Sequence, residues 1–307
     1  METQWAKDFG AKCAGAQINY QGVGSGAGIQ QLGAGTIDFA GSDVTMKSTE
    51  QAAANAACGS TAITMPVTAG GVAVIYNLKG LSAPVNLSAT TLAGLFQGTI
   101  KKWNDPAVAA DNPGVQLPAT AVTVFYRSDA SGTTQVFTGF EKAVAGSVWS
   151  LGTAKTVNWP TGQGAKGSDG VTAGVAQTAG GITYAEVSFA KSNHLPTAAV
   201  KGAGSSFSTI SAASVSSAIA AGFTITGIGN DLAGALDYTK MTDGYPISTV
   251  SYAIVCSRYK DSAKGTLVKD FLSYAVTGGQ PVAESLGFAP LPAELVSKDQ
   301  ASIAAVS

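Results

Sequence analysis

Charged residues are scarce in this 307-residue sequence, and their scarcity excludes several classes of protein. Only 12% of the residues are charged, and the 18 basic and 19 acidic side chains are scattered along the chain. Because no basic stripe is present, we expect no nucleic-acid partner. No apolar run is long enough to span a bilayer.

Histidine and cysteine are also rare. With a single histidine, His194, neither a metal site nor a Ser-His-Asp triad is expected, and nothing in the sequence indicates a cofactor. Cys13 and Cys58 lie in separate loop-like contexts, and we predict a disulfide between them, which would indicate an oxidising compartment. Cys256 lies in an apolar run, which predicts a buried, inert thiol.

The first residues carry no export signal. They form neither an apolar signal core nor a lipid-attachment site. Low charge with abundant Ala, Gly, Ser and Thr is nevertheless a tendency of exported proteins. We therefore expect a periplasmic or cell-surface protein whose signal or anchor segment has been processed away or lies outside this sequence.

The remaining composition indicates a folded chain of two domains. Apolar residues make up 45% of the sequence and glycine contributes 38 residues, which is enough for two compact cores at this length. Short strands alternate with helical patterns, with a break near residue 78 and a return near 247. We predict two α/β lobes, residues 1–77 with 247–307 and residues 78–246, joined by a hinge.

Within this pattern, residues 61–77 predict two strands joined by a turn at 69–71, and residues 2–10 predict a helix that buries Trp5 and Phe9. A further short strand is predicted to begin at residues 18–20.

Residues 126–134, Tyr-Arg-Ser-Asp-Ala-Ser-Gly-Thr-Thr, predict an anion site. A β-branched and aromatic run precedes them, and apolar residues at helical spacing follow, so a strand should lead into a helix that begins near Ser131 to Thr133. The first N–H groups of such a helix are unpaired and attract an oxyanion. Arg127 adds a forked donor that Asp129 can brace, and Gly132 lets a ligand approach the backbone. An ordinary strand-loop-helix join with a surface arginine is the alternative, with even odds for the motif alone.

A second glycine-rich turn, residues 21–29, opens another predicted helix at Ser25. Its spacing satisfies the permissive dinucleotide fingerprint, but that motif by itself is only a weak signal for a dinucleotide. A second oxyanion-binding helix start is the simpler interpretation. Asp43 then follows a short predicted strand, where it could face a ligand crevice or cap the helix that begins near Lys47; spacing alone slightly favours the cap.

Taken together, four segments in this order resemble the phosphate-binding proteins of bacterial ABC-type phosphate importers. The segments are residues 18–28, 36–43, 96–106 and 126–134, and residues 287–292 also fit. The resemblance covers almost the whole chain, and the placing of Cys13 and Cys58 is similar to actinobacterial members. It implies an α/β, two-lobed periplasmic-binding-protein-like fold with a hinge and an inter-lobe ligand cleft.

The resemblance also implies high-affinity binding of inorganic phosphate and delivery to membrane permease subunits by a monomer that is not an enzyme. It gives the phosphate contacts or their supports as Ser25, Asp43, Arg127, Asp129, Ser131, Gly132 and Thr133. For Asp43 it outweighs the capping interpretation. A carboxylate there would accept the proton of phosphate and repel sulfate, which has none.

In one respect the sequence departs from the family. Family members open with a strand and a glycine-rich loop that also touches phosphate, whereas Met1 falls just before the helix that carries Trp5. We expect a truncated start, with circular permutation through residues 202–207 as the lesser alternative. A chain complete as given should bind phosphate more weakly.

Three other functions are alternatives to phosphate binding. Another tetrahedral oxyanion, such as sulfate or molybdate, is the nearest alternative, and Asp43 argues against it. A truncated, non-binding cell-surface homologue is a further alternative. A phosphoesterase would need a nucleophile with a base or a metal, and no Walker-type lysine follows Gly132.

Overall fold

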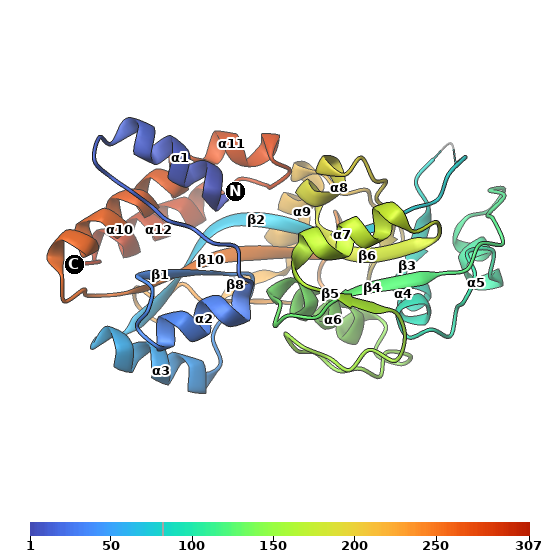
Figure 1. Cartoon of the computed structure of the whole chain (residues 1–307), viewed down its shortest axis with the longest axis horizontal. Coiled ribbons are helices and arrows are strands. Elements are labelled where there is room, and N and C mark those ends of the chain that lie inside the picture. The colour runs from blue at the N-terminus through green and yellow to red at the C-terminus, as the bar shows by residue number, and fades with distance from the viewer. Residues whose placement is uncertain (82) are drawn as a thin grey trace. The chain divides into compact units, whose positions relative to one another are not determined.

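The computed structural model describes residues 1–81 and 83–307 as a mixed α/β chain (Figure 1). The chain divides into two compact units. Unit 1 comprises Met1–Ala69, Phe223–Ala235 and Val250–Ser307, and unit 2 comprises Gly70–Gly222 and Leu236–Thr249. In the part of the chain described, no helix is long and apolar enough to cross a membrane. The two hinged lobes predicted above, residues 1–77 with 247–307 and residues 78–246, remain a prediction.

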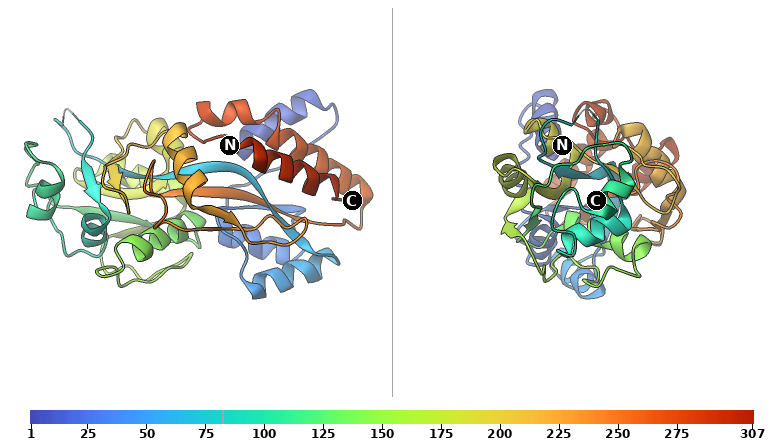
Figure 2. Two further views of the ribbon diagram at one scale, coloured as in Figure 1. Left: turned by 180° about the vertical axis from the view of Figure 1, so that it is seen from behind. Right: turned by 90° about the vertical axis from the view of Figure 1, so that its right-hand side faces the viewer.

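Unit 1 places its helices around antiparallel strands. Strand β1 (Phe39–Ser42) pairs with β10 (Ser248–Cys256), with Phe39 opposite Val255 and Ser42 opposite Tyr252. Its helices are α1 (Glu2–Lys12), α2 (Ser25–Gly33), α3 (Ser48–Cys58), α10 (Ser262–Val276), α11 (Gln280–Ser285) and α12 (Ala293–Ala304). Helices α10 and α12 pack side by side (Figures 1 and 2), as do α2 and α3. Strand β8 (Phe223–Ile225) pairs with β9 (Gly234–Leu236).

The N-terminal helix is held in place by its two large aromatic residues, as the sequence predicts. Trp5 and Phe9 are buried, and the ring of Phe9 meets that of Phe271 in α10 edge to face at 5.6 Å. The indole N–H of Trp5 donates to the carbonyl of Gly279 at 2.9 Å. Burial of two aromatic side chains fixes α1 on unit 1 far more firmly than its helix propensity could.

Unit 2 is built on a partly parallel sheet. Strand β6 (Gly181–Glu186) lies between β2 (Ala62–Tyr76), to which it is antiparallel, and β4 (Thr123–Arg127), to which it is parallel. Strand β5 (Gln163–Ala165) continues the sheet parallel to β4, and β3 (Asn86–Ser88) pairs with β7 (Ala199–Lys201) apart from it. The helices are α4 (Ala89–Phe96), α5 (Pro106–Asp111), α6 (Gly132–Val144), α7 (Gly167–Gln177), α8 (Val187–Ser192) and α9 (Ala212–Gly222).

The parallel strands decide where polar side chains gather. Because β4, β5 and β6 run in the same direction, their carboxyl ends meet at one edge of the sheet. Arg127 ends β4, Glu186 ends β6, and α7 begins two residues after β5. Helix α7 packs on β4 and β6 (Figure 1).

Strand β2 corrects one prediction. The sequence predicts two strands with a turn at residues 69–71, but β2 is a single strand of 15 residues, all buried. The glycines there serve packing: a Cβ on Gly71 would meet Cδ1 of Ile210 at 2.5 Å and Cγ2 of Val215 at 3.0 Å. The strand predicted at residues 18–20 is also wrong, because that segment forms no strand.

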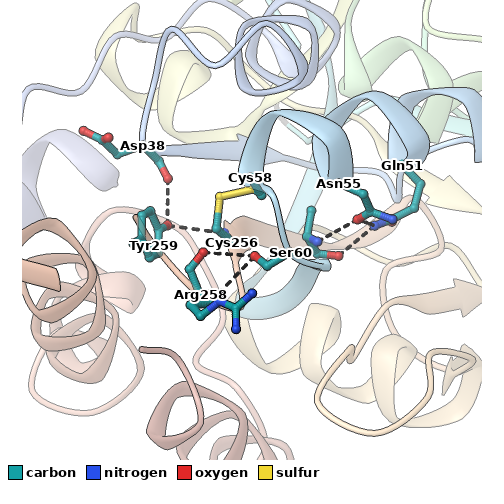
Figure 3. Close-up of a disulfide and its surroundings, with 9 residues drawn as sticks. Asp38, Gln51, Asn55, Cys58, Ser60, Cys256, Arg258 and Tyr259 are labelled. Atoms are coloured by element: carbon teal, nitrogen blue, oxygen red, sulfur yellow. Dashed lines mark hydrogen bonds between the residues drawn. A yellow bond between two sulfur atoms is a disulfide. The ribbon is translucent and has the colours of Figure 1, made fainter. Parts of the chain in front are cut away.

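The disulfide prediction is wrong as well. The bridge joins Cys58 to Cys256 (Figure 3), whereas Cys13 is a free, exposed cysteine. Cys58 ends α3 and Cys256 ends β10, and their Cα atoms lie 5.4 Å apart. The two segments are also joined where the N–H of Ser257 donates to the carbonyl of Thr61 at 2.8 Å. Cys256 is therefore buried, as predicted, but it is not a free thiol.

Candidate functional site

Arg127 is the centre of a polar cluster at the end of β4. Its side chain is only 6% exposed. Nε donates to Oδ1 of Asp129 at 2.7 Å and Nη2 donates to Oδ2 at 2.5 Å, so the carboxylate grips one edge of the guanidinium with two bonds. Nη1 donates to the hydroxyl of Ser168 at 3.1 Å. The predicted bracing of Arg127 by Asp129 is confirmed.

Both members of this ion pair are held in their charged forms. Burial alone would lower the pKa of Arg127, but the hydrogen bonds to Asp129 and its charge outweigh burial and raise that pKa. Burial alone would raise the pKa of Asp129, but Arg127 and the N–H of Gly167, which donates to Oδ1 at 3.0 Å, lower it. The cluster therefore keeps a fixed cation near neutral pH.

Helix α6 begins where the sequence predicts, with Ser131 as its N-cap. The hydroxyl of Ser131 accepts a bond from the N–H of Thr134 at 3.2 Å, and its own N–H donates to the carbonyl of Lys155 at 2.9 Å. Gly132 and Thr133 form the first turn, whose N–H groups have no acceptor within the helix. The Ser131 O–H proton and these two N–H groups are the donors that the helix start offers to an anion.

Two residues of the cluster were missed by sequence analysis. Ser168, in the first turn of α7, donates to Oε2 of Glu186 at 2.7 Å, and the hydroxyl of Thr133 donates to Oε1 of Glu186 at 2.8 Å. Thr133 is predicted above as a phosphate contact or a support for one, and in the structure its hydroxyl proton goes to Glu186. The alignment of parallel strand ends could have indicated Glu186, because it closes the strand next to β4.

Tyr184 supports the cluster from within the sheet. Its hydroxyl accepts from the N–H of Arg127 at 3.3 Å and shares a hydrogen bond with the hydroxyl of Thr134 at 2.8 Å. Its ring stacks on Phe137 of α6 with centroids 4.7 Å apart. Burial raises the pKa of Tyr184 to about 12, so its hydroxyl is neutral. One buried tyrosine thus ties the end of β4 to the start of α6.

In unit 1, Ser25 and Asp43 form a second polar cluster. Ser25 is the first residue of α2 and is buried, after Gly24, whose φ of 85° suits glycine. The N–H of Asp43 donates to the hydroxyl of Ser25 at 3.2 Å. The hydroxyl of Ser251, a third residue missed by sequence analysis, donates to Oδ1 of Asp43 at 2.7 Å.

Asp43 does not cap α3. The N-cap of α3 is Lys47, whose N–H is accepted by the carboxylate of Glu50 at 2.8 Å, and Asp43 follows β1 four residues earlier. The structure therefore removes the capping interpretation of Asp43. It leaves a carboxylate that accepts a bond from the hydroxyl of Ser251 at the end of a strand, and strand ends are where open α/β sheets bind ligands.

The seven predicted residues thus form two groups, each described within its own unit. Ser25 and Asp43 lie together in unit 1, and Arg127, Asp129, Ser131, Gly132 and Thr133 lie together in unit 2. Among the described residues, no group of three His, Cys, Asp or Glu side chains could hold a metal ion. The chemistry present suits an anion receptor: unit 2 offers the buried guanidinium of Arg127, hydroxyls and the N–H groups of a helix start, and unit 1 offers a carboxylate acceptor.

Comparison with known proteins agrees with this chemistry. A family model described as PBP superfamily domain matches residues 2–278. The chain is 41% identical over 309 residues to phosphate-binding protein PstS3 of Mycobacterium bovis, covering 99% of this chain and 83% of that protein. It is 36% identical over 304 residues to phosphate-binding protein PstS of Pasteurella multocida, covering 97% and 85%.

Solved structures are also similar. The structure of a high affinity periplasmic phosphate-binding protein, PfluDING, bound with phosphate, matches with a TM-score of 0.79 at 25% identity, covering 97% of this chain and 90% of that one. The mycobacterial and Pasteurella relatives are matched over nearly all of this chain, so the similarity spans both units rather than one motif. The chain therefore belongs to the family of PstS phosphate-binding proteins, within the PBP superfamily.

Proposed function

We propose that this chain binds inorganic phosphate and delivers it to the membrane permease subunits of an ABC-type importer. The observation that carries the proposal is the unit 2 cluster, in which a buried, doubly braced Arg127 lies five residues before the first residue of α6. A braced guanidinium and the N–H groups of a helix start together match the oxygens of a phosphate.

Asp43 supplies selectivity in this proposal. Phosphate near neutral pH carries at least one proton, whereas sulfate carries none. An ionised Asp43 would accept the hydrogen bond of that proton but would face only lone pairs and charge in sulfate. Ser25 would add a hydroxyl from the start of α2.

The proposal treats the chain as a receptor and not an enzyme. Its relatives carry the name phosphate-binding protein, and the unit 2 cluster offers hydrogen-bond donors that suit an anion. We propose an exported protein, periplasmic or at the cell surface, that acts as a monomer. The disulfide between Cys58 and Cys256 fits an oxidising compartment.

Calorimetric titration tests this function. The purified chain, stripped of phosphate, is titrated with phosphate and then with sulfate near neutral pH. We expect phosphate to bind and sulfate to bind at least about a hundredfold more weakly, because a proton acceptor repels the unprotonated ion.

Variants assign the binding to the two clusters. Arg127→Ala and Asp43→Asn should each weaken phosphate binding by about tenfold or more, as expected for loss of a charge-assisted contact. Arg258→Ala, which removes an exposed arginine, is the matched control and should bind as the wild type does. Absence of phosphate binding in the wild-type chain would contradict the proposal, and equal binding of sulfate would favour a general oxyanion receptor.

A further inference from the structure

Trp159 is a loop residue whose indole ring packs on aromatic rings from four elements of unit 2. It lies between α6 and β5, and its ring stacks on that of Tyr126 in β4, with centroids 5.5 Å apart, and on that of Tyr184 in β6, at 5.8 Å. It also meets the rings of Phe96 in α4 and Phe137 in α6, at 5.9 Å and 6.5 Å. One loop side chain therefore joins two strands and two helices.

The segment that carries Trp159 is tied to the anion site on both sides of this residue. Before it, the carbonyl of the buried Lys155 accepts from the N–H of Ser131, the N-cap of α6, at 2.9 Å. After it, β5 pairs with the end of β4, and the carbonyl of Ala165 accepts from the N–H of Ser128 at 3.0 Å. These bonds leave Trp159 little freedom to move away from the rings that it contacts.

The ring of Tyr184 links Trp159 to the anion site through its hydroxyl. That hydroxyl accepts from the backbone N–H of Arg127 at 3.3 Å and shares a bond with the hydroxyl of Thr134 at 2.8 Å. Arg127 ends β4, and Thr134 lies in the first turn of α6. Because the ring of a tyrosine is rigid and its hydroxyl lies at the tip, any tilt of the ring moves the hydroxyl relative to both partners.

We propose that Trp159 is a positioning residue for phosphate binding, which acts through the ring of Tyr184 to hold the end of β4 and the start of α6 together. Trp159 does not touch the ligand in this proposal. The inference rests on the proposed function and goes beyond it, since it gives a role in binding to a loop residue outside both polar clusters.

Amide hydrogen exchange, measured by NMR on the phosphate-stripped chain, tests the positioning directly. Exchange of the Arg127 N–H reports how often its bond to Tyr184 opens. In Trp159→Met, which keeps apolar bulk but has no flat ring, we expect this N–H to exchange about tenfold faster than in the wild type. In Trp159→Phe, which keeps a ring that can stack, the rate should stay within about twofold of the wild type.

The matched control is a second N–H that donates to a buried tyrosine of unit 2. The N–H of Val74 donates to the hydroxyl of Tyr245 at 3.4 Å, and Trp159 makes no ring contact with that tyrosine among the described residues. Its exchange should therefore be the same in the wild type and in Trp159→Met. Trp159 is only half-buried, so the variant removes no core side chain, and Trp159→Leu repeats the test if Trp159→Met fails to fold.

Calorimetric titration with inorganic phosphate tests the consequence for binding. Trp159→Met should weaken binding about tenfold, and Tyr184→Phe, which removes only the hydroxyl, about fivefold. The double variant should bind about tenfold more weakly than the wild type rather than about fiftyfold, because a ring without its hydroxyl has no bond left to position. Trp159→Phe should bind within about twofold of the wild type, and calorimetric stoichiometry reports the folded fraction of each protein.

Each outcome supports or overturns the inference. Equal acceleration of exchange at Val74 and Arg127, or additive losses in the double variant, would mean that unit 2 is loosened as a whole, which overturns it. Unchanged exchange and binding in Trp159→Met overturn it too, as does failure of both ringless variants to fold, since Trp159 would then serve the fold. These results leave the proposed function intact. A wild-type chain that binds no phosphate overturns the proposed function, and the binding role of Trp159 with it.

Discussion

Ser251 donates its hydroxyl proton to Oδ1 of Asp43 across 2.7 Å, although 208 residues separate the two in the sequence. Strand β10 carries Ser251 and the end of β1 leads to Asp43, and the two strands pair directly. A hydroxyl that donates to a carboxylate stabilises the ionised form and fixes its orientation. Asp43 is thus held as an acceptor by a residue of a different chain segment.

Ser251→Ala should therefore weaken phosphate binding about fivefold and reduce the preference for phosphate over sulfate, because one hydrogen bond to a charged group is lost. Competition calorimetry with the two ions measures both effects. Ser248→Ala is the matched control, since it removes a buried hydroxyl of the same strand that donates to the carbonyl of Tyr245 and not to Asp43. An unchanged preference in Ser251→Ala would show that Asp43 needs no such support.

Asp129→Asn should destabilise the chain near neutral pH by about 3 kcal/mol, because Arg127 would be left buried without its counter-charge. Burial alone would raise the pKa of Asp129 in the folded protein, but its bonds to Arg127 and to the N–H of Gly167 outweigh burial and lower that pKa. Its contribution is therefore present above the ordinary pKa of aspartate and is lost as pH falls through the lowered value. Urea unfolding at several pH values should show the two proteins converging in acid. A deficit of constant size at every pH would count against the ion pair.

Asp299→Asn should have the opposite dependence on pH. Asp299 in α12 is fully buried, neither carboxylate oxygen has a hydrogen-bond partner among the described residues, and burial raises its pKa to about 8. The wild-type chain therefore loses stability as pH rises from the ordinary aspartate pKa towards about 8, while the variant does not. We expect similar stability in acid and a variant that is more stable by a few kcal/mol on the alkaline side. Glu294→Gln, on the exposed face of the same helix, is the control and should leave the slope unchanged.

Loss of the disulfide should lower the free energy of unfolding by about 2–5 kcal/mol, because the bridge closes a long loop in the unfolded chain. Cys58 and Cys256 are 198 positions apart. Denaturant unfolding of Cys58→Ser with Cys256→Ser, compared with the wild-type chain, measures the loss. Cys13→Ser should unfold as the wild type does, and an equal loss in that variant would mean that the bridge is not the cause.

The local parts of the site were predictable because their signals are local. Residues 126–134 contain the whole strand-loop-helix turn, and β4 ends at Arg127 and α6 begins at Gly132 as expected. Arg127 and Asp129 are two positions apart, so their pairing could be expected from sequence alone. Ser168 lies 41 positions from its partner Arg127, and Glu186 lies 53 positions from its partner Thr133. Only the order of the strands in the sheet brings these residues together.

The wrong predictions also concern contacts between residues that lie far apart in the sequence. Gly70 and Gly71 predict a turn because glycine favours turns. In the structure Ile210 packs so closely on Gly71 that a side chain there would collide with it, and this packing also requires glycine. The loop-like contexts of Cys13 and Cys58 predict a bridge between them, and this prediction is wrong. The correct partner, Cys256, was recognisable only once the end of β10 was known to lie against the end of α3.

The exposed thiol of Cys13 affects how this chain must be handled. An unpaired cysteine on the surface can couple to the same residue of a second molecule under oxidising conditions. A covalent dimer would then appear on a sizing column whatever the native assembly, and the proposed monomer can be judged only with a reductant or with Cys13→Ser. The same thiol offers one attachment point for a fluorescent reporter, since the other two cysteines are consumed by their bridge.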